Sequence, residues 1–168
     1  MYRFHRAVRR LKSNSTAAKT ARSTGPTAAW ANGGAGIVQM KAKDALEPVL
    51  RDIRATGVPV PTVQSTRQED KDLWLAILTA SDESSHGFYI DLSLTRAQLV
   101  CSVAESTQEW VFDEMQSAGR TNWPLCPLHP RTHPLKAVVA KGIPQWACPS
   151  ENIAISEIGD LEQDRTAQ

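Results

Sequence analysis

The sequence has no long hydrophobic run: none of its apolar stretches reaches the roughly 20 residues that span a bilayer. It has only three cysteines. The disulfide framework of a small secreted protein needs a larger and even number. Its 41% apolar and 22% charged residues are ordinary for a globular chain. These features predict a protein with no membrane partner in a reducing compartment, which we take to be the cytoplasm.

Acidic residues are absent from the first 43 positions, which carry nine Lys or Arg. The rest of the chain has ten basic and eighteen acidic residues, a net charge of −8. We therefore expect the folded part to repel nucleic acid. The chain also has no phosphate-binding loop, no G-x-S-x-G elbow and no H-E-x-x-H helix. No motif in the sequence indicates a substrate.

Residues 1–39 form a basic, Ser- and Ala-containing leader with no periodic apolar pattern, which predicts disorder. Three interpretations remain open. The leader resembles an organellar transit peptide, or it is an arm that binds an anionic partner such as nucleic acid. Alternatively, Met40 is the true start and the leader is not translated natively.

Residues 40–121 are predicted to be an α+β domain. An apolar stripe at helical spacing predicts a helix of about 14 residues from Lys41. The apolar run Leu73–Ala80 predicts a buried or central strand, and the alternation over 88–94 predicts a second strand antiparallel to it. Gly57 suits the end of the helix. The stripe consists of Leu46, Val49, Leu50 and Ile53.

A second helix is predicted from the capping pair Thr95 and Gln98 to about Ala118. Residues 122–161 follow as a metal-binding hairpin, turned at Gly142, with a last short strand near Ile155. Residues 162–168 are expected to fray. The predicted fold class is therefore α+β, with two helices packed on a small antiparallel sheet and a C-terminal zinc-bound hairpin.

Cys126, His129, His133 and Cys148 have the spacing C-x2-H-x3-H-x14-C. Thiolates and imidazoles are the donors that zinc prefers, and four of them suit a tetrahedral structural site. Neighbouring prolines restrict the loop and lower the entropy lost when it closes. The pattern predicts one structural Zn²⁺ held by these four residues, whose binding contributes to folding.

The sequence leaves open a different ligand set, in which Glu151 or His86 replaces one of the four proposed ligands. Three ligands and a bound water would make a zinc-dependent hydrolase. Such an enzyme would need a general base, for which Asp113 and Glu114 are the candidates. No catalytic residue is predicted from these acids, since carboxylates near a helix end are usually solvated.

Cys101 lies beside the apolar stripe of the second helix and is expected to be a packed thiol. Four tryptophans are expected to pack in the core or around the metal loop, with an exposed partner-binding cluster as the alternative. They are Trp74, Trp110, Trp123 and Trp146.

The stretch from about Asp72 to Leu161 resembles a group of small, uncharacterised zinc-knuckle or zinc-ribbon proteins of high-GC Gram-positive bacteria. The similarity rests on 109–114, 118–120, 123–129, 133–135 and 146–149. The resemblance implies the same metal site and a cytoplasmic bacterial setting. It also favours Met40 as the start, and it implies no activity.

Together these patterns predict a binding or adaptor module with a protein partner, more readily than an enzyme. The alternatives are the hydrolase with an open coordination position and a nucleic-acid-associated zinc protein that uses its leader.

Overall fold

The computed structural model describes residues 33–67, 72–116 and 122–162. Of the leader predicted to be disordered over residues 1–39, residues 1–32 lie outside the described part, whereas 33–39 are helical, so the prediction is wrong for them. Of the predicted tail 162–168, residues 163–168 also lie outside the described part. Helix α1, Gly33–Ala55, begins before the predicted Lys41. A helix that is already nucleated and packed can extend by adding one hydrogen bond per residue. None of the helices in the described ranges is both long and apolar enough to cross a membrane.

The first sheet has the antiparallel order β1-β2-β3. Its strands are β1, Thr62–Arg67, β2, Leu73–Thr79, and β3, Ser85–Asp91. The predicted hairpin is confirmed, because β2 pairs with β3 along its whole length. Strand β1 was not predicted, since it is a polar edge strand without apolar alternation. The second strand of the hairpin starts earlier than predicted, because backbone pairing continues into the polar residues before Phe88.

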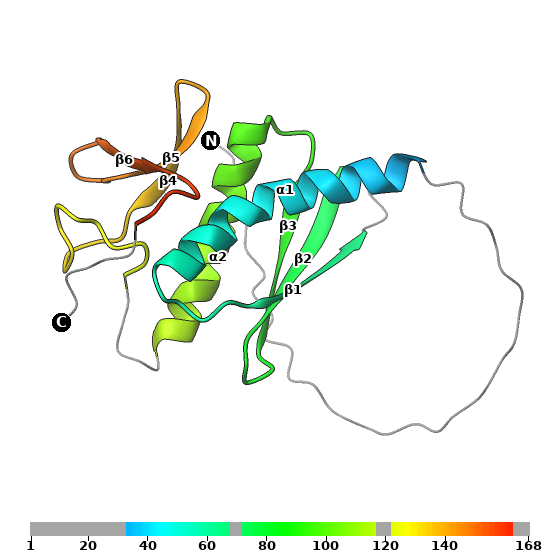
Figure 1. Cartoon of the computed structure of the whole chain (residues 1–168), viewed down its shortest axis with the longest axis horizontal. Coiled ribbons are helices and arrows are strands. Elements are labelled where there is room, and N and C mark those ends of the chain that lie inside the picture. The colour runs from blue at the N-terminus through cyan, green and yellow to red at the C-terminus, as the bar shows by residue number, and fades with distance from the viewer. Residues whose placement is uncertain (1–32, 68–71, 117–121, 163–168) are drawn as a thin grey trace, which may run out of the picture.

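Helix α2, Arg96–Gln116, begins at the predicted cap. The side-chain oxygen Oε1 of Gln98 accepts a hydrogen bond from the backbone N–H of Thr95 at 3.1 Å. The apolar stripe of this helix is buried, as predicted, while the predicted end at about Ala118 falls outside the described residues. The buried residues include Leu99, Val100, Val103, Ala104, Thr107, Trp110, Val111 and Met115. Helix α2 contacts α1 and both sheets, and Figure 1 shows it standing between the sheets.

The second sheet has the antiparallel order β4-β5-β6. Its strands are β4, Lys136–Ala140, β5, Ile143–Ala147, and β6, Ala154–Glu157. Lys141 and Gly142 have φ of 51° and 79°, so a two-residue turn with left-handed backbone joins β4 to β5, at the predicted position. Buried side chains from both helices and both sheets belong to one hydrophobic core. The α+β class is thereby confirmed, with the C-terminal hairpin widened into a second sheet.

Gly159 lets the C-terminal segment approach α1 closely. Its φ is 108°, and a Cβ there would lie 2.7 Å from Nη2 of Arg51 and 3.0 Å from Cβ of Pro48. We expect Gly159→Ala to lower the free energy of unfolding by about 1–3 kcal/mol through backbone strain alone, with the steric contact adding to it. Gly57→Ala is the control, because Gly57 has φ of 70° and no atom lies within 4 Å of the place that a Cβ would take. Equal losses for the two variants in urea denaturation would contradict the close approach.

Candidate metal centre

The first half of the candidate centre is a loop between Trp123 and Leu135 with two consecutive turns. The N–H of His129 donates to the carbonyl of Cys126 at 3.1 Å, and the N–H of Thr132 donates to the carbonyl of His129 at 3.1 Å. The base of the loop is closed where the N–H of Leu135 donates to the carbonyl of Pro124 at 2.8 Å. This local hydrogen bonding brings Cys126, His129 and His133 to one side of a short loop. We call residues 123–135 the knuckle loop.

Cys148 supplies the second half, directly after β5. Its N–H donates to the carbonyl of Ile153 and its carbonyl accepts from the N–H of Asn152, both at 2.9 Å. The N–H of Glu151 also points at the Cys148 sulfur, at 3.4 Å. The turn thus presents the sulfur to the knuckle loop.

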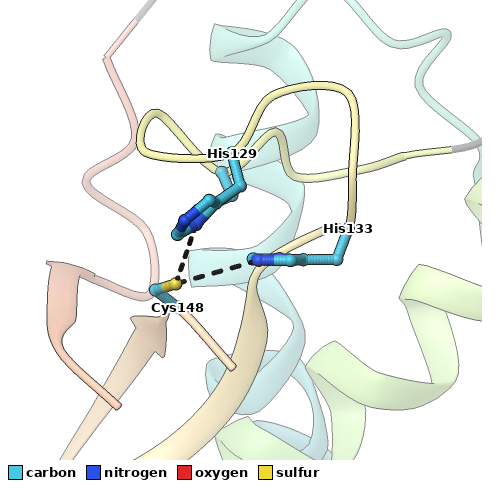
Figure 2. Close-up of side chains that lie close together, drawn as sticks. His129, His133 and Cys148 are labelled. Carbon is cyan, nitrogen blue, oxygen red and sulfur yellow. Dashed lines mark hydrogen bonds between the residues drawn. The ribbon is translucent and has the colours of Figure 1, made fainter. Parts of the chain in front are cut away.

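The four side chains converge. Nδ1 of His129 lies 3.4 Å from Sγ of Cys148 and 3.8 Å from Sγ of Cys126. Nε2 of His133 lies 3.9 Å from Sγ of Cys148. All four donor atoms lie within 4.8 Å of one another. Figure 2 shows both imidazole rings directed at the sulfur of Cys148 from the neighbouring loop.

Three of the sulfur–nitrogen distances, 3.4, 3.8 and 3.9 Å, are close to those around a tetrahedral ion. With Zn–S of about 2.3 Å and Zn–N of about 2.0 Å, adjacent sulfur and nitrogen donors stand about 3.5 Å apart. The two sulfur atoms are fully buried, whereas the histidines are partly exposed. Two thiolates neutralise a divalent cation, so a loaded site would place no net charge in the core. The group Cys126, His129, His133 and Cys148 can therefore hold one metal ion.

Each histidine has an oxygen near its other ring nitrogen. Nδ1 of His133 lies 3.0 Å from the carbonyl oxygen of Pro134, and Nε2 of His129 lies 3.8 Å from Oε1 of Glu151. The carbonyl of Pro134 can accept only from a protonated Nδ1 of His133, which is the tautomer that leaves Nε2 as the metal-binding nitrogen. At 3.8 Å, Glu151 is too distant to hydrogen-bond to His129. Glu151 lies beside the nitrogen of His129 that is not directed at the sulfurs. Oγ of Ser150 lies 3.0 Å from Nε2 of His133, so this hydroxyl also borders the site.

The sequence prediction missed three polar residues that hydrogen-bond to the segments flanking the centre. Asp52 is fully buried and accepts from Nε1 of Trp146, and Thr56 accepts from Nε1 of Trp123. Nε2 of Gln108 donates to the backbone carbonyls at both ends of the knuckle loop, at 2.7 Å each. One signal was available: Asp52 and Thr56 continue the line of Val49 at helical spacing, so two polar residues fall on the apolar side of the helix.

The remaining candidates lie elsewhere. His86 belongs to β3 in the first sheet and is not part of the four-residue group. Glu114 accepts a hydrogen bond from Ser84 at the β2–β3 turn, at 3.2 Å, so it is engaged with the first sheet. Trp74, Trp110, Trp123 and Trp146 are all buried. The alternative of an exposed tryptophan cluster is therefore wrong, because their rings fill the core.

Cys101 is a buried thiol, as predicted. Burial is the main reason that its pKa rises to about 11, and Glu105 adds to the rise while a hydrogen bond with the backbone of Gln145 opposes it. At pH 8 the thiol is therefore neutral and a poor nucleophile. We expect iodoacetamide to leave Cys101 unmodified in the folded protein and to modify it in urea, as read by mass spectrometry. Rapid native labelling of Cys101 would contradict this packing.

No family model matches this chain, and no curated protein or solved structure matches it either. The geometry of the site itself therefore carries the functional argument.

Proposed function

We propose that this protein is a binding or adaptor module whose C-terminal sheet is held in place by one structural zinc ion. The main support is the meeting of four Cys and His donors from two separate loops, with both sulfurs fully buried. A closed set of two thiolates and two imidazoles is typical of structural zinc. The resemblance to small bacterial zinc-knuckle proteins, and the cytoplasmic setting that it implies, belong to the same proposal.

Exposed apolar side chains support a protein partner. Seven large hydrophobic residues are exposed among the described residues, and five of them belong to the knuckle loop, the second sheet or the turn after Cys148. Val139 and Ile143 lie at the turned end of the β4–β5 hairpin, and the other three lie in the knuckle loop or after Cys148. Exposed apolar side chains can serve as contacts for another protein. These five are Leu125, Leu128, Val139, Ile143 and Ile153.

A hydrolase has less support. It would need an open coordination position, whereas four donors already converge here. It would also need a nearby base, whereas Glu114 accepts a hydrogen bond from Ser84 in the first sheet. Nucleic-acid binding by the knuckle region also has little support, because only Arg131, Lys136 and Lys141 are basic between the two ligand cysteines. Binding by the leader stays a separate possibility that deletion of residues 1–39 tests.

The deciding experiment is elemental analysis of protein purified without a histidine tag. One zinc per chain, with a lower melting temperature after chelation, is the expected result. A chain that carries no metal and melts unchanged with chelator present would refute the structural-zinc role.

The binding role is tested separately with Leu128→Ser and Ile153→Ser. These variants should keep zinc but lose any protein that co-purifies with the wild type.

A further inference from the structure

The end of α1 contacts both halves of the candidate metal centre without supplying a ligand. Asp52 and Thr56 lie one helical turn apart, so their side chains project from the same side of the chain. Oδ2 of Asp52 accepts from Nε1 of Trp146 at 2.7 Å, and Oγ1 of Thr56 accepts from Nε1 of Trp123 at 2.8 Å. Each indole thus has a fixed hydrogen-bond acceptor, in the last turn of α1 for Trp146 and on the residue directly after the helix for Trp123.

Both acceptors are themselves held in place. The hydroxyl of Thr56 donates to the carbonyl of Asp52 at 2.7 Å, which orients a lone pair toward Trp123. The carboxylate of Asp52 also accepts from the backbone N–H groups of Gly159 and Leu161 at 2.8 and 2.9 Å. Neither side chain can rotate away without losing a second hydrogen bond.

Each tryptophan lies shortly before one of the two cysteine ligands in the sequence. Trp146 is two residues before Cys148, and Trp123 is three residues before Cys126. Both indoles are buried, and the two rings pack edge to face with centroids 5.7 Å apart. The distance between the indoles therefore sets the distance between the chain segments that carry the two sulfurs.

We propose that Asp52 and Thr56 are positioning residues for the metal centre: through Trp146 and Trp123 they hold Cys148 and Cys126 at the separation that the ion requires. The proposal rests on the proposed zinc-binding function. Metal affinity then depends on the end of α1, which contributes no donor atom. In return, metal binding restrains the end of α1.

The test compares Thr56→Val and Asp52→Ala, which remove the two hydrogen-bond acceptors, with the wild type. Zinc affinity is measured by competition with a chromogenic chelator, at a temperature where every variant is folded. We expect each variant to bind zinc about tenfold more weakly, as is typical when a group behind the ligands is removed. The absorption bands of bound Co²⁺ should shift too, because they report the geometry of the donors. Thr56→Ser keeps the hydroxyl and should restore wild-type affinity.

Leu46→Ala is the matched control, since Leu46 is buried in the same helix. It should lower the melting temperature while zinc affinity and the Co²⁺ bands stay as in the wild type. If Thr56→Val and Asp52→Ala behave like Leu46→Ala, or if Thr56→Ser binds as weakly as Thr56→Val, the positioning role is overturned while zinc binding stands. If the wild type binds no zinc, the proposed function fails and this role fails with it.

Discussion

Cys148→Ser is expected to abolish metal binding and most of the cooperative unfolding transition. Its sulfur is fully buried and stands 3.4 Å from the His129 nitrogen, so a hydroxyl there would leave three donors around a buried gap. Binding of structural zinc releases about 10 kcal/mol or more, which is comparable to the about 5–15 kcal/mol that stabilises a whole domain. Metal content per chain and the thermal melt measure the two effects, and Cys126→Ser should behave in the same way.

Cys101→Ala and His86→Ala are the controls for this experiment. Cys101 is a buried cysteine in α2, and His86 lies in the first sheet, so neither belongs to the four-residue group. Both variants should keep the metal content of the wild type. If either one loses its metal, the assigned ligand set is incorrect. Chelation of the wild type should reproduce the melt of Cys148→Ser.

Asp52→Ala is expected to lower the free energy of unfolding by about 3–5 kcal/mol. The substitution leaves the indole N–H of Trp146 and the backbone N–H groups of Gly159 and Leu161 without their acceptor. An unsatisfied buried donor costs about 1–3 kcal/mol, and the three costs are not fully additive. Urea denaturation measures the loss. Asp44→Ala, an exposed position on the same helix, should change stability by no more than about 0.5 kcal/mol.

The free energy of unfolding should depend on pH through the carboxyl group of Asp52. Burial raises the pKa of Asp52, while the hydrogen bonds from Trp146, Leu161 and Gly159 oppose the rise and Asp160 adds to it. Because the folded state binds this proton more tightly than the unfolded state, the contribution of Asp52 is greatest below its unfolded pKa. It declines as the pH rises through the folded pKa.

The comparison with Asp52→Asn isolates this effect, because protonation of the metal ligands acts on both proteins. The difference in free energy of unfolding, wild type minus variant, should shrink as the pH rises from about 4, the ordinary pKa of Asp, toward neutrality. A difference that grows with pH would mean that the three donors outweigh burial and stabilise the ionised form.

The local patterns of the sequence predicted most of the elements because short-range physics decides them. The apolar stripe from Leu46 to Ile53 lies in α1, and Thr95 with Gln98 caps α2. Gly142 turns the C-terminal hairpin because its left-handed backbone suits a residue without a Cβ. The same reasoning failed for β1, whose polar residues become a strand only because β2 offers them an edge to pair with.

By itself the sequence determined the four ligand candidates, because donor chemistry and loop spacing are local properties of the chain. It could not determine what brings Cys148 to Cys126, since that depends on partners distant in sequence. Only the tertiary structure placed the α1 carboxylate of Asp52 against Trp146, and Thr56 against Trp123. Helical spacing places these two polar residues on the apolar side of the helix, but it does not identify their partners, because the packing of the whole core selects them.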